Sequence, residues 1–108
     1  MNVEHAKITR DVLKRIDQAH GAMSINRVLT LLELGLQGGE EVSYSTLLSK
    51  LGWDAPQLSK NLTEMSYHGR RGLGLNWVKV DLDPTNRQRR IVSFTGQGRK
   101  FIDLVTGE

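Results

Sequence analysis

The chain has 108 residues, which is enough for one domain with one hydrophobic core. It has no cysteine, which excludes a disulfide scaffold and a cysteine-based zinc site, and its three histidines lack metal-ligand spacing. Hydrophobic residues make up 38% and charged residues 25%, and no apolar run has the length of a membrane span. These features predict a cytoplasmic domain without a metal, a cofactor or a membrane partner.

The net charge of +3 is unevenly distributed along the chain. Residues 1–54 carry a net charge of −1, whereas residues 55–100 hold nine Lys or Arg against three acids, a net charge of +6. A basic region of this kind is what binding to the phosphate backbone of nucleic acid requires. A solvated basic surface without a partner has the same composition, so the charge alone leaves both interpretations open.

Two helices are predicted in the N-terminal part of the chain. The first covers residues 3–20, and its apolar side chains recur at helical spacing on one face: Ile8, Val12 and Ile16. That face either covers the chain's own core or contacts a second copy of the chain. Ser24 is a suitable N-cap for a second helix over residues 25–36, which is apolar on most sides and is expected to be the central buried helix.

Residues 43–67 predict two short helices joined by a tight turn. Ser43 is the candidate N-cap of the first helix, and Gly52 ends it. Asp54 is the candidate N-cap of the second helix, 55–66, whose apolar stripe consists of Leu58, Leu62 and Met65. This pair is either a DNA-binding helix-turn-helix or an ordinary helical hairpin, and the stretch alone does not decide between them.

A glycine-rich basic loop follows at residues 66–76. It lacks the G-x-x-x-x-G-K-[ST] pattern and the strand-then-helix context of a phosphate-binding loop, so nucleotide binding is not predicted. We expect two of its residues, Arg70 and Arg71, to add to a DNA-binding surface.

Residues 77–95 predict a β-hairpin with a basic tip and a basic returning edge. Its expected parts are a strand over 77–82, a turn over 83–86 and a strand over 90–95. Thr95 can cap a last helix over residues 96–105. A helix-turn-helix followed by a basic hairpin is the winged-helix arrangement, in which the second helix enters the major groove and the hairpin reaches the neighbouring groove. The predicted fold is therefore mainly α, a single winged helix-turn-helix domain over residues 1–108 with the order α-α-β-α-α-β-β-α.

Within this arrangement the sequence resembles the MarR family of winged-helix transcriptional regulators. The family pattern has L-G-x-x before the recognition helix, V-S-R-x-[IL] on that helix, and then D-P-x-D-x-R, V-x-L-T and G-[KR]. The corresponding segments here are LGWD at 51–54, LSKNL at 58–62, DPTNR at 83–87, VSFT at 92–95 and GR at 98–99. The resemblance extends over residues 24–102, and it rests on the order and spacing of motifs that are individually weak.

The resemblance implies which residues contact DNA. On the recognition helix they are Pro56, Gln57, Ser59, Lys60 and Asn61. On the wing, Arg87 corresponds to the arginine that enters the minor groove, and Asp83 to the aspartate that braces it. Arg89 and Arg90 correspond to positions that hold phosphates.

The chain departs from the family pattern in several places. Asn86 stands where a second aspartate is frequent, Lys60 stands where arginine is usual, and the loop over residues 67–76 is longer than in most members. Family members usually dimerise through their first helix and a long C-terminal helix pair, whereas only thirteen residues follow Thr95. The expected dimer contact is therefore formed by Ile8, Val12, Ile16, Phe101 and Val105. A complete pocket for a small-molecule effector is not expected.

The resulting prediction is a homodimeric repressor that binds a palindromic site in double-stranded DNA. The alternative is a winged-helix module that binds or inhibits a protein partner, since a fold does not dictate its function. An enzyme is not predicted, because the serine, histidine and acidic residues show no catalytic spacing.

Overall fold

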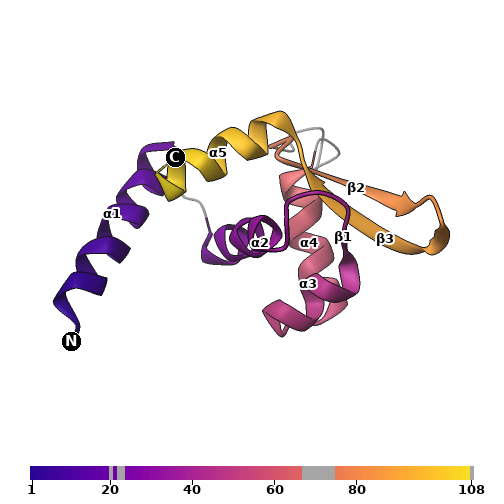
Figure 1. Ribbon diagram of the computed structural model, residues 1–108, viewed down its shortest axis with the longest axis horizontal. Helices are drawn as coiled ribbons and strands as arrows, with labels where there is room; N and C mark the ends of the chain where they lie inside the picture. Colours follow the sequence, from indigo (N-terminus) through magenta and orange to yellow (C-terminus); the bar gives the residue numbers. More distant parts are fainter. Residues whose placement is uncertain (20, 22–23, 67–74, 108) are drawn as a thin grey trace.

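The computed structural model describes residues 1–19, 21, 24–66 and 75–107. Its elements, in chain order, are α1 (Val3–Ala19), α2 (Ile25–Leu36), β1 (Val42–Ser43), α3 (Tyr44–Leu51), α4 (Ala55–Met65), β2 (Val78–Asp83), β3 (Asn86–Phe94) and α5 (Gly96–Thr106). This order confirms the predicted winged-helix arrangement. Figure 1 shows α1 projecting at one end of the molecule and the β2–β3 hairpin, hereafter the wing, projecting at the other. No helix in the described ranges is long and apolar enough to cross a membrane.

The helices α2, α3, α4 and α5 begin at the side-chain caps that the sequence predicts. In each case a backbone N–H of the first turn, which has no partner inside the helix, donates to a side-chain oxygen. The bonds are Arg27 N to Ser24 Oγ (3.2 Å), Thr46 N to Ser43 Oγ (3.1 Å), Gln57 N to Asp54 Oδ1 (2.9 Å) and Gly98 N to Thr95 Oγ1 (3.1 Å). Gly52 ends α3 at a φ of 71°, a left-handed conformation that glycine adopts without steric cost.

The sheet is antiparallel with the strand order β1-β3-β2. β1 pairs with β3 at only two positions, Val42 with Val92 and Ser43 with Ile91. From Arg90 toward the turn, β3 therefore pairs with β2 alone, and this part of the hairpin extends beyond the third strand. β3 begins at Asn86 and not at residue 90 as predicted, because pairing with β2 extends the strand through basic residues whose own strand propensity is low.

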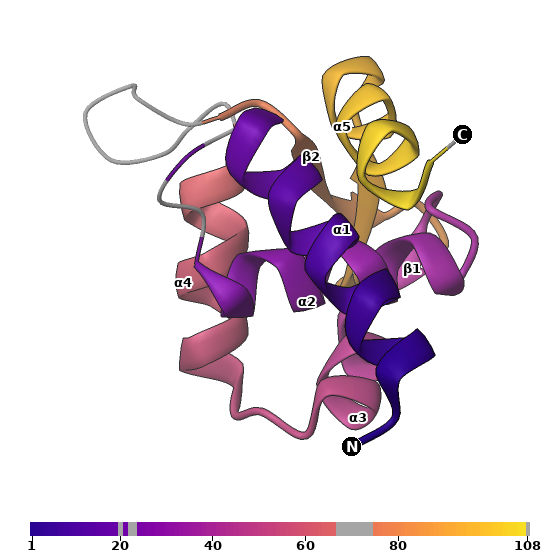
Figure 2. The same ribbon diagram turned by 90° about the vertical axis from the view of Figure 1, so that its left-hand side faces the viewer.

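The core surrounds α2, which contacts α3, α4, α5 and β3. Its largest fully buried hydrophobic side chains are Leu31, Leu34, Leu47, Leu58, Leu62, Met65, Val78, Val92 and Val105. Figure 2, which looks along the molecule from the α1 end, shows α2 behind α1, with α4 and α5 on either side. The prediction that α2 is central is confirmed, but it is not buried on most sides, since Ile25, Leu29 and Leu36 are exposed. α4 is held on this core by its apolar stripe.

Three of the five residues predicted to contact a second copy lie instead in the chain's own core. Ile16, Phe101 and Val105 are buried, because α1 packs against α5 within the same chain. Arg15 Nη1 also donates to the Val105 carbonyl oxygen at 3.5 Å across this contact. Val12 is half-buried, and only Ile8 is mostly exposed, at 60%. The predicted dimer surface is corrected accordingly.

Candidate nucleic-acid interface

A groove of about 630 Å³ separates the N-terminal turns of α3 and α4 from the wing. The residues that line it are Tyr44, Ser45, Leu48, Ala55, Pro56, Ser59, Gln88, Arg89 and Arg90. Two basic side chains of the wing thus face the start of the predicted recognition helix. Segments that are about thirty residues apart in the sequence form one open, positively charged groove.

The outward face of α4 carries most, but not all, of the predicted contact residues. Pro56 and Lys60 are exposed, and Gln57 and Ser59 are half-buried. Asn61 is only 7% exposed, and its Nδ2 donates to the Gln57 carbonyl oxygen at 2.8 Å. The expectation that Asn61 contacts DNA is therefore corrected, because this side chain points toward the core and satisfies its amide within the helix.

An ion pair ties α4 to α2. Arg27 of α2 donates from Nε and Nη2 to Glu64 Oε2 of α4, at 3.0 and 2.5 Å. Both side chains are about two-thirds or more buried, so this pair is less screened than a surface pair. It adds a directional contact to the apolar packing that holds α4 on α2.

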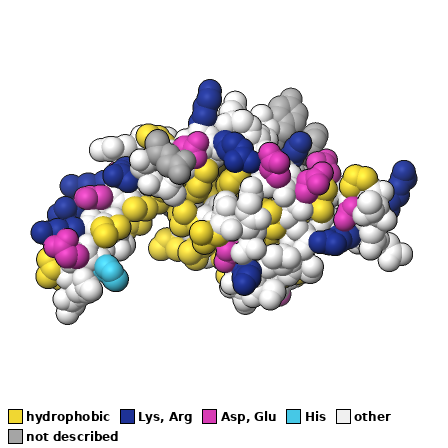
Figure 3. Space-filling model, in the orientation of Figure 1, with side chains coloured by type: hydrophobic (Ala, Val, Ile, Leu, Met, Phe, Trp, Pro, Cys, Tyr) yellow, Lys and Arg dark blue, Asp and Glu magenta, His cyan; other side chains and the backbone are white. Residues whose placement is uncertain are grey.

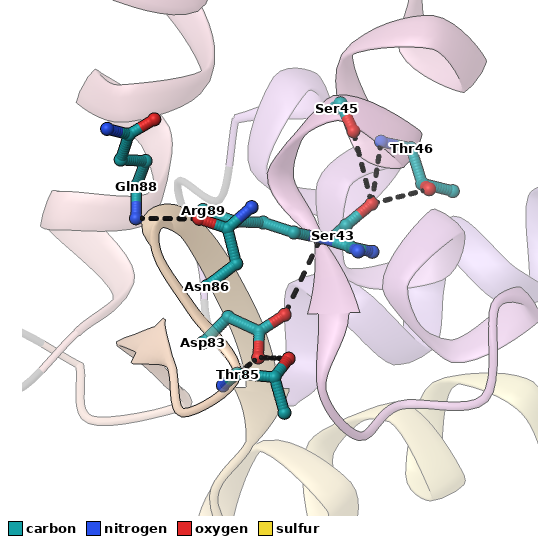
Figure 4. A network of polar contacts seen from close by, with 8 residues as sticks. All are labelled: Ser43, Ser45, Thr46, Asp83, Thr85, Asn86, Gln88 and Arg89. Carbon is teal, nitrogen blue, oxygen red and sulfur yellow. Dashed lines mark hydrogen bonds and ion pairs between the residues drawn. The ribbon is translucent and has the colours of Figure 1, made fainter.

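The turn of the wing is organised by Asp83, shown in Figure 4. Its Oδ1 accepts bonds from the Thr85 backbone N–H at 2.9 Å and from the Thr85 hydroxyl at 2.8 Å. Its Oδ2 lies 3.8 Å from Arg89 Nε. The prediction that Asp83 braces Arg87 is therefore wrong, because the ion pair forms with Arg89. Leu82 pairs with Arg90 in the sheet, the register then shifts so that Asp83 pairs with Asn86, and the Arg89 side chain reaches Asp83 at this irregularity.

Because Asp83 pairs with Arg89, the Arg87 side chain remains available to contact a ligand. It is exposed on the first half of β3, and within the described residues it has no ion-pair partner. A guanidinium without an internal partner is the form that binds an external phosphate at the lowest desolvation cost.

The hydrogen bonds from Thr85, first from its backbone and then from its side chain, lower the pKa of Asp83, and the Arg89 charge lowers it further. A carboxyl whose folded-state pKa is depressed stabilises the fold above its unfolded pKa and loses that contribution as pH falls through the lower folded value. We expect an NMR titration of Asp83 to give a midpoint below the ordinary value of 3.8. The Thr85 amide shift should follow the same curve.

Asp81 on the same strand provides the matched control for this titration. Asp83→Asn should abolish the pH response of the Thr85 amide, whereas Asp81→Asn should preserve it. An Asp83 midpoint at or above 3.8 would contradict the bonding described for this turn.

Several residues of the interface have no signal in the sequence. Tyr44 lies in the groove, with the Arg90 guanidinium 5.7 Å from its ring centroid, and its hydroxyl shares a hydrogen bond with Ser59. Ser45, Gln88 and the exposed Thr63 of α4 also border this surface or lie beside it. Isolated polar residues of these types form no motif, so only the three-dimensional arrangement identifies them. The predicted contacts Arg70 and Arg71 lie outside the described residues.

Comparison with protein-family profiles and with curated protein sequences finds no match to this chain. Solved structures, however, are similar. A mutant of MepR from S. aureus bound to an oligodeoxyribonucleotide has a TM-score of 0.76 at 14% sequence identity, covering 95% of this chain and 68% of that one. MarR has a TM-score of 0.66 at 19% identity, covering 99% and 74%.

A third similar structure is CouR from Rhodococcus jostii RHA1 bound to p-coumaroyl-CoA, with a TM-score of 0.67 and 18% identity, covering 95% of this chain and 65% of CouR. For another MarR-family regulator, the match spans only 58% of the longer protein. At these identities the similarity establishes the fold, and it agrees with the order of motifs in the sequence. The chain has the winged-helix fold of the MarR-family transcriptional regulators.

Proposed function

We propose that this chain is a sequence-specific regulator that binds double-stranded DNA and represses transcription by occupying its site. The observation that carries the proposal is the groove between α4 and the wing, with Lys60 exposed on the helix and Arg87 on the wing without an ion-pair partner among the described residues. A helix of this kind fits the major groove, and a basic hairpin beside it reaches the phosphates or the neighbouring minor groove. The DNA-bound state of the similar MepR mutant supports the same assignment.

The polar side chains of α4 are suited to reading base edges. Gln57 has both a donor and an acceptor, and Lys60 is a flexible donor that suits guanine acceptors. We also assign Ser59 and Thr63 to this surface, because both have hydroxyls on the accessible side of the helix. The position of Arg89 and Arg90 along the groove supports a role for both in contacting phosphates.

We further propose that the active form is a homodimer on a palindromic site. The apolar side chains that α1 leaves exposed are Val3, Ile8 and Leu13, and Leu104 of α5 is also exposed. Figure 3 shows hydrophobic side chains gathered where α1 meets the rest of the molecule, at the end opposite the wing. A second copy bound at this end would leave both grooves free.

Selection of duplexes from a random pool, combined with the mass of the complex in solution, tests the proposal. We expect an enriched palindrome whose half-sites are about one helical turn apart, bound by two copies of the chain. Failure to enrich any sequence, together with no binding to duplex DNA at low salt, would contradict it.

A protein partner is the second candidate function. It is favoured by the outer face of α2, where Ile25 is 72% exposed and Leu36 is 79% exposed. Single exposed apolar residues are common on protein surfaces, so this observation carries less weight than the basic groove. Stable capture of one defined protein, with no affinity for duplex DNA, would favour this candidate.

A further inference from the structure

Tyr44 contacts both of the elements that the proposed function assigns to DNA. It is the first residue of α3, and its hydroxyl shares a hydrogen bond with the Ser59 hydroxyl of α4. On the other side, the guanidinium carbon of Arg90 in β3 lies 5.7 Å from the centroid of its ring. A cation near an aromatic face at this distance is attracted to the ring. Tyr44 therefore links the recognition helix to the wing.

The position of Arg90 in the sheet makes this link important for the wing. β1 supports β3 only at Val92 and Ile91. Arg90 is the next residue toward the turn, and from there β3 pairs with β2 alone. Among the described residues, the Arg90–Tyr44 contact is the outermost hydrogen bond, ion pair or ring contact between the wing and the helices.

Open space lies on two sides of Tyr44, and the rest of its side chain packs against the core. The groove of about 630 Å³ lies on one side. A second cleft of about 370 Å³ separates α4 from β2 and β3, and it shares three lining residues with the groove: Tyr44, Ser59 and Arg90. These three side chains form a partition between the two spaces. The angle between α4 and the wing at this point depends on their contacts.

We infer that Tyr44 is a positioning residue that fixes the wing relative to the recognition helix, and this inference rests on the proposed function. A protein that contacts DNA at two places binds more tightly when the two elements are already held at the spacing of the duplex, because less conformational freedom is lost on binding. Tyr44 supplies this preorganisation through Ser59 and Arg90, without itself having to contact DNA.

A first test measures the wing in the free protein. The chain has no cysteine, so spin labels at Thr63→Cys in α4 and Gln88→Cys in the wing report one distance. Tyr44→Leu, which removes both contacts, should broaden the distance distribution. Tyr44→Phe keeps the ring and should broaden it less, while Ser49→Ala on the same helix should leave it unchanged. Equal widths in the parent, Tyr44→Phe and Tyr44→Leu proteins would overturn the inference.

A second test is a double-mutant cycle on binding to the selected duplex. Tyr44→Phe should weaken binding about threefold to tenfold, the range expected for one lost hydrogen bond. In an Arg87→Ala, Arg89→Ala background, where two of the three proposed wing contacts are removed, the same change should weaken binding much less. An equal loss in both backgrounds would overturn the inference, since Tyr44 would then act independently of the wing.

The two tests also separate this inference from the proposed function. If the parent protein binds no duplex, the proposed function fails, and the spin-label distances alone decide whether Tyr44 positions the wing. Thermal denaturation of Tyr44→Phe checks that the variant remains folded.

Discussion

Gly98→Ala is expected to cost the fold more than about 3 kcal/mol, the upper part of the range for overpacking a buried site. A Cβ at this position would lie 1.9 Å from the Trp77 carbonyl oxygen and 2.8 Å from its carbonyl carbon. The obstructing atoms are backbone, and that same oxygen accepts a bond from Thr95 N at 3.0 Å, which anchors the start of α5. Neither the Trp77 backbone nor the start of α5 can move away without breaking the hydrogen bond between Thr95 N and the Trp77 oxygen. Chemical denaturation of the variant measures the loss.

Gly96→Ala is the matched control for this prediction. Gly96 lies two residues earlier in the same helix, and a Cβ there would meet no atom within 4 Å. The free energy of unfolding should change by less than about 1 kcal/mol, and alanine's higher helix propensity favours a small gain. Equal stability of the two variants would show that α5 does not approach the Trp77 backbone as closely as described.

Arg87→Ala is expected to weaken binding to duplex DNA about tenfold at moderate salt, because it removes one phosphate or minor-groove contact. The slope of log affinity against log salt should fall by about 1, the amount expected for one lost phosphate contact. Arg87 is exposed and has no ion-pair partner among the described residues, so its removal should leave stability unchanged. Fluorescence anisotropy at several salt concentrations gives both quantities.

Lys7→Ala is the control for Arg87→Ala, because it removes one positive charge from exposed α1, at the end of the molecule opposite the wing (Figure 1). Its affinity and salt slope should stay close to those of the parent. Unchanged binding by the double variant Arg87→Ala, Arg89→Ala would argue against a role of the wing in DNA binding.

Local patterns were sufficient to predict the elements of this fold. The caps at Ser43, Asp54 and Thr95 each depend on a bond to a backbone N–H only three residues away, so sequence spacing identifies them. The order of a helix-turn-helix and a basic hairpin then indicated the winged helix, and the structure confirms it.

The pairing of side chains within the site could not be predicted in the same way. Asp83 forms its ion pair with Arg89 at a break in the strand register between Leu82 and Asp83, and the order of neighbouring arginines in the sequence does not reveal this break. Asn61 is one position along α4 from the exposed Lys60, and only the rotation of α4 on the core places it inward. Ile16 forms part of an apolar stripe that would serve equally well against α5 or against a second copy.

An amide NMR titration with the selected duplex tests whether the groove between α4 and the wing binds DNA. We expect the largest shift changes in α4 from Ala55 onward, at the start of α3 and along the wing from Asp83 to Arg90. Residues of α1 far from the groove, such as Lys7, should change little. Changes centred on α1 or on the outer face of α2, with none in α4 or the wing, would show that DNA does not bind in this groove.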